Sequence, residues 1–309
     1  HCFNMSALTL TNNLVAHELI EKSDEIVNGK LNPFNKNNVM ITENKVQNIL
    51  KKYGIYHNIG NLSLYQVGMV HKSYTIPYIN EVCSRDNVKV VPNPDGCVLL
   101  QNESYDRLEF LGDAVIENIV VSYLYTRYPD QPESFLSFMK VNLVNRIMLG
   151  HLTKVLGLDE YLIISRTLDD VNKAREEDKI LCDVFEGFIG ALYCDFNSIN
   201  GQGYQYAEKF MITLLEDERS KVDFTELILN DTNFKEKIIR YNRNFNKFVP
   251  IFDMFSIEGD NEGNEKKVTI HIVHPKTSEI LGIGTGNTKK KAEQSASRNG
   301  LIKLGLLSK

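Results

Sequence analysis

Two strongly apolar stretches, each carrying a pair of acidic residues at helical spacing, constrain the fold of this chain more than any other feature. Glu109 and Asp113 are four residues apart, so a helix places their Cβ atoms on one face, about 5–6 Å from each other. Asp183 and Glu186 are three residues apart in the second stretch. Most other positions in both stretches are apolar, which predicts two buried helices.

Acidic pairs in buried helices need a partner, because carboxylates repel each other and are costly to desolvate. Packed side by side, the two helices would form an all-oxygen site, which suits Mg²⁺ or Mn²⁺. Alternatively, each pair is a charged helix surface matched by Arg107, Arg127 or Lys179. The recurrence of the same arrangement on two apolar helices favours the metal site.

The bulk composition is that of an ordinary soluble protein with room for about two domains in 309 residues. No apolar run approaches the ~20 residues that span a bilayer, so we expect no membrane contact. The N-terminus lacks the pattern of a secretory signal. The five cysteines are widely spread without a Cys-x-x-Cys pair, which argues against a disulfide framework or a zinc site. We expect an intracellular protein of the cytoplasm or nucleus.

The net charge of −5 is unevenly distributed along the chain. Residues 224–309 hold 14 Lys or Arg against 10 Asp or Glu, and residues 1–223 hold 21 against 30. An acidic surplus is typical of regions that collect metal ions, and a basic surplus is typical of regions that grip phosphates. Either surplus is also compatible with ordinary protein surface.

The pattern of apolar residues predicts four segments. They are an N-terminal helical extension (1–60), an all-α domain (61–215), a polar linker (216–223) and a small α+β domain (224–309). In the extension, weak helical patterns lie near residues 10–19 and 46–50. In the all-α domain, helices are expected at about 104–126, 134–156, 170–195 and 203–216, and the proline-containing stretch 77–101 is interpreted as a long loop or insertion.

The C-terminal segment changes from helical to mixed patterns. A helix is expected near residues 234–241, three strands near 248–257, 267–273 and 279–285, and a last helix near 288–304. In the middle strand Val268, Ile270 and Ile272 alternate with polar residues, the period of a half-buried strand. The order α-β-β-β-α defines a small two-layer domain.

The acidic stretches resemble a known family. Asn102–Ala114 resembles the signature of the ribonuclease III family, and His71–Tyr74, Val144–Arg146 and Asp183–Tyr193 match further family blocks in the same order. The resemblance covers about residues 62–215. It implies an all-α endonuclease domain that hydrolyses RNA phosphodiesters to leave 5′-phosphate and 3′-hydroxyl ends.

The same resemblance implies the roles of individual residues. The metal-binding catalytic acids would be Glu109, Asp113, Asp183 and Glu186, and they would hold two Mg²⁺ ions, for which Mn²⁺ can substitute. Asp106 stands where the family usually has Glu, and Glu133 falls near another acidic position, so both are candidates for outer positions of the site. Lys179 resembles a lysine near the site of eukaryotic members, where it would stabilise phosphate charge; the alternative is a salt bridge to Asp183. No Walker loop is present, so no nucleotide cofactor is expected.

The last helix opens with three consecutive lysines, Lys289, Lys290 and Lys291, after a plausible N-cap at Thr288. Lysines in a first turn oppose the helix dipole, and a phosphate at that helix end removes the conflict. The whole segment resembles a double-stranded RNA-binding domain, which implies that these lysines contact phosphates and that Glu236 faces a minor groove. The acidic loop 259–265 departs from the family by lacking a Gly-Pro and a His.

One nuclease domain supplies one set of acids, so the resemblance implies a homodimer that cuts both strands of double-stranded RNA. Phe110, beside the acids, would lie at the dimer interface or in the core. The N-terminal extension, the insertion, Lys179 and the richness in Asn most resemble a budding-yeast type Dicer, which makes small interfering RNAs. The alternatives are a ribonuclease III that processes ribosomal and small nuclear RNA precursors, and a non-catalytic duplex-RNA binder.

Overall fold

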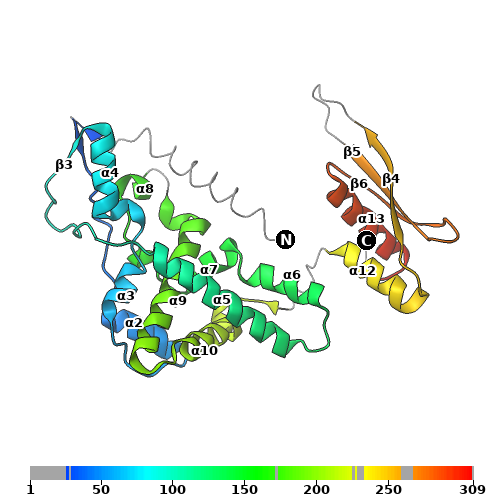
Figure 1. Ribbon diagram of the computed structural model, residues 1–309, viewed down its shortest axis with the longest axis horizontal. Coiled ribbons are helices and arrows are strands. Elements are labelled where there is room, and N and C mark those ends of the chain that lie inside the picture. Colours follow the sequence, from blue (N-terminus) through cyan, green and yellow to red (C-terminus); the bar gives the residue numbers. More distant parts are fainter. Residues whose placement is uncertain are drawn as a thin grey trace. The chain divides into compact units, whose positions relative to one another are not determined.

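The computed structural model describes residues 26–27, 29–170, 173–224, 227, 233–258 and 267–307. The chain divides into two compact units, one made of residues 1–132 and 139–222 and the other of residues 133–138 and 223–309. Within the part of the chain that the structure describes, no helix has the length and apolarity that crossing a membrane requires. Figure 1 labels the elements of both units.

The first unit is built mainly of helices, which confirms the predicted all-α class. In chain order these are α2 (Glu43–Lys52), α3 (Leu62–Val67), η1 (Lys72–Tyr74), α4 (Ile76–Asp86), α5 (Asp106–Arg127), α6 (Glu133–Leu143), α7 (Arg146–Leu156), η2 (Asp159–Tyr161), α8 (Arg166–Asp170), η3 (Ala174–Glu176), α9 (Asp178–Asn200), α10 (Gly203–Glu216) and η4 (Glu218–Ser220). α6 begins in the second unit and ends in the first. Figure 1 shows the two long helices α5 and α9 side by side in the middle of the first unit.

Helices α5 and α9 touch at backbone level. Gly112 of α5 lies directly against the backbone carbonyl of Glu186 on α9, and a Cβ at that position would collide with it. Gly190 of α9 lies in the same way against the carbonyl of Leu108. Because neither glycine carries a side chain, the two helices that bear the acidic pairs approach more closely than larger residues allow.

A small sheet interrupts the helical unit, and the sequence pattern did not predict it. β1 (Ile26–Val27) pairs antiparallel with β2 (Lys30–Leu31), which pairs in parallel with β3 (Lys89–Val90). The expected helix near residues 46–50 is present as α2, in which Val46, Ile49 and Leu50 are buried. The expected helix near residues 10–19 lies outside the described residues.

Polar side chains of the Asn-rich segment before α2 form hydrogen bonds with residues 164–175 of the first unit. Asn35 donates hydrogen bonds to the carbonyl of Ile164 (3.3 Å) and to Asp169 (2.8 Å). Asn38 donates to the same carbonyl (3.0 Å) and accepts a hydrogen bond from Arg175 (3.1 Å). Both asparagines are buried, so these bonds satisfy groups that would otherwise be costly to bury.

The interpretation of residues 77–101 as a loop is wrong at its start, where α4 occupies Ile76–Asp86. Pro77 lies in the first turn, the one part of a helix that tolerates proline. Ile79 and Val82, three residues apart, are both buried. The prolines favoured the prediction of a loop, although the spacing of Ile79 and Val82 is helical.

Two expected helices have different bounds in the structure. The stretch 134–156 is divided into α6 and α7, because the side chain of Asn145 accepts a hydrogen bond from the Met148 amide (2.9 Å) and caps α7. The helix expected at 170–195 begins at Asp178 and ends at Asn200. The helix that follows, 203–216, has the expected bounds.

The second unit has the predicted α-β-β-β-α order. It consists of α12 (Phe234–Tyr241), η5 (Asn242–Asn246), β4 (Ile251–Glu258), β5 (Lys267–Val273), β6 (Ile280–Gly286) and α13 (Lys289–Lys303). The three strands form an antiparallel sheet in the order β4-β5-β6. Val268, Ile270 and Ile272 face the buried core together with Ile238 of α12, as the alternation predicted.

The glycines of β6 allow α13 to lie directly on the sheet. A Cβ at Gly284 would collide with the backbone of Ala296, and one at Gly282 would collide with its carbonyl. This close packing fixes the direction of α13 and therefore the position of its first turn, which carries the three lysines.

We expect Gly112→Ala to destabilise the first unit, because the added methyl group must push α5 away from α9. Overpacking a close contact of this kind costs about 1–3 kcal/mol. The free energy of unfolding from a urea titration measures the effect, with Ala114→Ser on the exposed side of α5 as the control. Equal stability of Gly112→Ala and the wild type would contradict the backbone contact.

Candidate functional site

The first two turns of α5 carry acidic side chains that differ in exposure. Asp106 starts the helix and is exposed, and Asp113 is exposed two turns further on. Glu109, between them, is half-buried. The helix therefore holds Glu109 closer to the protein interior than its two acidic neighbours.

The acids of α9 lie deeper than those of α5. Asp183 is half-buried and Glu186 is 9% exposed. The Sγ atom of Cys182 donates a hydrogen bond to Oε1 of Glu186 at 3.3 Å. One ligand atom each of Cys182, Asp183 and Glu186 lie within 4.8 Å of one another, a spacing at which a single cation can contact all of them.

The electrostatics show that the two acidic pairs meet. Burial raises the pKa of Glu186 to about 8, and the carboxylates of Asp113 and Asp183 add to this. Burial also raises the pKa of Glu109 to about 7, with the Asp183 carboxylate as the next cause. Each pair is thus influenced by an acid of the other helix, and the structure brings all four predicted acids to one place.

Two cations partly offset this negative charge. The pKa of Asp183 is raised by burial, and Lys179 and Arg146 act against that rise. Lys179 also lowers the pKa of Glu109. Lys179 therefore lies beside acids from both helices, and Arg146, at the start of α7, is a cation that we did not single out from the sequence.

The donor set of the site shows whether it suits a metal ion. Four carboxylates from two helices lie close enough to raise one another's pKa, and only two cations, Lys179 and Arg146, act against this rise at Asp183. The buried Tyr105 hydroxyl lies near Asp183, and burial, followed by Asp183, raises its pKa well above the usual value. Crowded carboxylates fit a divalent cation, and oxygen donors suit Mg²⁺ or Mn²⁺.

The two outer acidic candidates lie in different surroundings. Asp106 raises the pKa of both Glu109 and Asp183, so it lies close to the acids. Glu133 is exposed at the start of α6, where it accepts a hydrogen bond from the Ser137 hydroxyl at 2.6 Å. Glu133 belongs to the second unit and the four acids belong to the first, so its outer acidic role stays a prediction.

Two further residues of the family blocks have clear environments. His71 accepts a hydrogen bond from the Ser73 amide at 3.1 Å, and burial lowers its pKa to about 3. It is a neutral residue that caps η1. Phe110 is 82% exposed, which excludes the core position that the sequence had left open.

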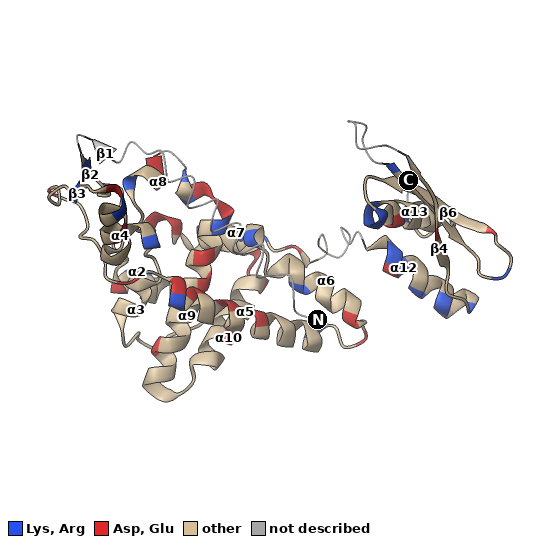
Figure 2. Ribbon diagram, turned by 45° about the horizontal axis from the view of Figure 1, so that its top comes forward, with Lys and Arg blue, Asp and Glu red and all other residues tan. Residues whose placement is uncertain are grey.

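The second unit presents the predicted lysines at the start of α13. The Thr288 hydroxyl accepts a hydrogen bond from the Lys291 amide at 3.2 Å, which confirms the helix cap. Lys289, Lys290 and Lys291 are exposed. Glu236 is half-buried in the first turn of α12. The acidic loop 259–265 lies outside the described residues. In Figure 2 basic residues mark the start of α13 and the length of α12, and acidic residues mark α5 and α9.

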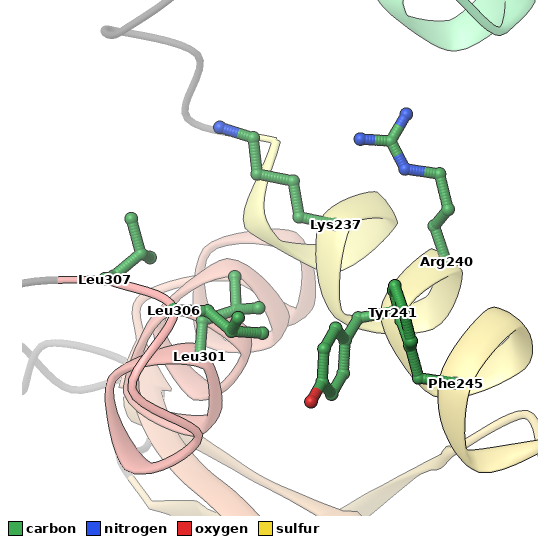
Figure 3. A pocket seen from close by; sticks show the side chains of 7 residues that line it. All are labelled: Lys237, Arg240, Tyr241, Phe245, Leu301, Leu306 and Leu307. Carbon is green, nitrogen blue, oxygen red and sulfur yellow. The ribbon is translucent and has the colours of Figure 1, made fainter.

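A pocket of about 360 Å³ lies between α12, η5 and the end of α13. Figure 3 shows Lys237 and Arg240 extending upward from α12 and the rings of Tyr241 and Phe245 below them, and all four residues line the pocket. Apolar side chains complete its lining, namely Leu301, Leu306 and Leu307. These two cations were not predicted as a pair from the sequence. They are three residues apart on α12, so both lie on the side of the helix that faces away from the buried Ile238.

Comparison with known families matches both units. Residues 106–197 match the Ribonuclease III domain, and residues 237–304 match the Double-stranded RNA binding motif. The first match contains all four acids, and the second contains the three lysines.

The chain is also similar to individual proteins. It is 33% identical over 269 residues to the Probable ribonuclease 3 of Acanthamoeba polyphaga mimivirus, covering 86% of this chain and 46% of that relative. It is 32% identical over 202 residues to Ribonuclease 3 of Chlorobaculum tepidum, covering 65% of this chain and 69% of that relative. The solved nuclease domain of ribonuclease III from Campylobacter jejuni, described for flexibility in a region involved in dimer formation, has 21% identity and a TM-score of 0.43, covering 60% of this chain and 99% of that chain.

We expect the stability of the metal-free protein to depend on the charge of Glu186. Because burial raises the pKa of Glu186 from 4.5 to about 8 in the folded state, its protonated side chain stabilises the folded protein below pH 4.5, and this stabilisation is lost as the pH rises through about 8. Glu186→Gln has no proton to lose, so its stability does not fall for this reason over the same pH range. The melting temperature of Glu186→Gln relative to the wild type should therefore be higher at pH 9 than at pH 5.

Calorimetry with and without Mg²⁺ measures this difference. Mg²⁺ should raise the melting temperature of the wild type at pH 9 more than that of Glu186→Gln, because a ligand stabilises only the state that binds it. Glu160→Gln, an exposed acid of the same unit, serves as the control. A pH-independent difference between Glu186→Gln and the wild type would contradict the assignment of a buried, mutually repelling acid.

Proposed function

Since the chain belongs to the ribonuclease III family, whose members are endoribonucleases, we propose that it cleaves both strands of double-stranded RNA as a Mg²⁺-dependent homodimer. The observation that carries the proposal is the meeting of two acidic pairs at the contact of α5 and α9. The Double-stranded RNA binding motif in the same chain supplies the substrate class. The chain spans less than half of the mimivirus relative, and the activity proposed is that of the two units described above.

Each of the two helices would contribute two acids to the binding of the cations. Glu109 and Asp113 would contribute ligands from α5, and Asp183 and Glu186 would contribute ligands from α9. When bound, a pair of divalent ions supplies a nucleophile from water at neutral pH and Lewis-acid stabilisation of the leaving oxygen. Mg²⁺ is the ion whose preference for carboxylate oxygens this donor set fits best, with Mn²⁺ as a substitute.

Lys179 would act on the phosphate. It lies beside Glu109 and Asp183, with Arg146 also near Asp183, and a fixed cation there stabilises the charge that develops on the phosphate oxygens during the reaction. The alternative role, a plain salt bridge to Asp183, would leave Lys179 with an effect on stability and none on the chemical step.

The start of α13 would grip the duplex. Exposed lysines and the free amides of a helix N-terminus point at the same anion, so Lys289, Lys290 and Lys291 would bind phosphates. Glu236 and Arg240 on α12 would lie at a minor groove, since duplex-binding domains read A-form shape and 2′-hydroxyls.

Two active sites are required to cut two strands, and one chain supplies one. Phe110 leaves 82% of its side chain exposed beside the acids. A large aromatic residue exposed at this point suits an interface with a second copy of the chain, because burial of such a side chain stabilises association.

The product class that we favour is small interfering RNA made by a Dicer-type enzyme inside the cell. The N-terminal segment that packs on the nuclease unit and Lys179 support this choice. Processing of ribosomal and small nuclear RNA precursors is the alternative within the family.

Substitution of any one of the four acids should abolish cleavage while leaving duplex binding intact. We expect Glu109→Gln and Asp183→Asn to lower the cleavage rate by at least about a thousandfold, because each removes a ligand of the reactive ions. Gel analysis of a labelled duplex with Mg²⁺ or EDTA measures cleavage, and Glu160→Gln is the control. Wild-type protein that binds duplex RNA and never cuts it with Mg²⁺ would leave only the binding role.

Replacing Lys289, Lys290 or Lys291 by Ala should weaken duplex binding uniformly across sequences. Each phosphate contact that is lost should reduce the slope of log affinity against log salt concentration by about 1. Fluorescence anisotropy at several salt concentrations measures the slope, with the exposed Lys276→Ala as the matched control. Slopes equal to that of Lys276→Ala would show that these lysines do not bind phosphates of the duplex.

The lengths of the products distinguish the two biological roles. A Dicer-type enzyme should convert a long, perfectly paired duplex into short products of even size. Cleavage restricted to particular stem-loops, with the long duplex left intact, would instead identify a precursor-processing enzyme.

A further inference from the structure

Helix α13 carries one acid, and it lies close to the lysines of the first turn. Glu293 follows Lys289 and Lys290 by four and three residues, so the helix places all three side chains on one face. Glu293 is 9% exposed. A carboxylate near the proposed phosphate contacts opposes duplex binding through charge repulsion. Phosphate binding alone therefore does not explain an acid at this position.

The carboxylate of Glu293 is paired with a cation of the other helix. Nζ of Lys235, in the first turn of α12, lies 2.7 Å from Oε2 of Glu293. The same Nζ atom is 4.7 Å from the centre of the Phe252 ring on β4. The Glu293 side chain is 12% exposed and that of Lys235 is 36% exposed, so salt screens this pair less than an exposed one. Lys235 is thus held between two groups that attract a cation.

Hydrogen bonds of Gln294 connect the same two helices. Its Oε1 atom accepts a hydrogen bond from the Lys235 amide at 3.1 Å, and its Nε2 atom donates one to Oδ1 of Asn233 at 3.3 Å. Asn233 in turn caps α12 by accepting a hydrogen bond from the Glu236 amide at 3.4 Å. Neighbouring residues in the second turn of α13 therefore hold both the cap and the first turn of α12.

A fixed separation between α12 and α13 matters because the two helix starts would meet different parts of a duplex. The proposed function places α12 at a minor groove and the lysines of α13 at phosphates. An A-form duplex has a narrow major groove and a wide minor groove, whereas the major groove of B-form DNA is about 12 Å wide. Helices held at one separation match one of these shapes. Helices that can shift adapt to either shape and lose affinity through the cost of ordering.

We propose that the Lys235–Glu293 ion pair and the hydrogen bonds of Gln294 fix the separation of α12 and α13 and thereby set the preference of the second unit for A-form duplexes. These three side chains are positioning residues, which act through the lysines at the start of α13. The inference rests on the proposed function, because it takes duplex RNA as the ligand.

The affinities of the full chain for RNA and DNA duplexes of the same sequence, about 16 bp long, test this role. Fluorescence anisotropy in EDTA measures both, since removal of divalent ions prevents cleavage. We expect Glu293→Gln to weaken binding to RNA by at least about fivefold and not to weaken binding to DNA, because only the preorganised fit to RNA is lost. Charge repulsion alone predicts the opposite sign for RNA. Glu279→Gln is the matched control, because it removes one exposed acid of the same unit.

Two further variants separate the positioning role from direct contact with RNA. Lys235→Met keeps an apolar side chain beside Phe252 and removes the ion pair. If the pair acts as a unit, the double variant Lys235→Met/Glu293→Gln has the same RNA-to-DNA affinity ratio as either single variant. Gln294→Met removes both hydrogen bonds without a change of charge and should also lower that ratio. A double variant that loses the two single effects added together would contradict a shared role.

The wild type separates failure of this inference from failure of the proposed function. A wild type that prefers RNA, with Glu293→Gln and Gln294→Met that keep its affinity ratio, would overturn the inference and leave the proposed function intact. A wild type with equal affinity for both duplexes would overturn both. Melting curves show whether each variant is folded at the assay temperature, and an unfolded second unit would lose affinity for RNA and DNA alike.

Discussion

The backbone contact between α5 and α9 is the constraint on which the rest of the candidate site depends. Gly112 and Gly190 remove the side chains that would hold the helices apart, so acids on two different helices share one small region. The spacing within each pair follows from the helix itself. The distance between the pairs follows only from this contact, and electrostatic coupling of Glu109 to Asp183 is its consequence.

This arrangement stores unfavourable electrostatic energy that a cation can release. Burial and mutual repulsion raise the pKa of Glu109 to about 7 and that of Glu186 to about 8, so in the absence of metal the folded protein holds protons that an exposed acid would lose. Binding of a divalent cation would replace these protons and neutralise the carboxylates. Function and stability are therefore linked through the same groups, as in other sites where perturbed pKa values mark the chemistry.

Much of the fold and the site could be predicted from local sequence patterns. The spacing of Glu109 and Asp113 and the alternation in β5 are local, and both correspond to the structure. Features that depend on long-range contacts could not be read in this way. Strand β2 pairs in parallel with β3, which lies far along the chain. The exposure of Phe110 likewise depends on helix orientation.

Anomalous diffraction from crystals soaked in Mn²⁺ tests the central claim most directly, because it locates the ions without relying on activity. The account predicts two peaks about 3.5–4 Å apart, bounded by Glu109, Asp113, Asp183 and Glu186. Ions bound elsewhere, or acids from α5 and α9 that never share an ion, would contradict it.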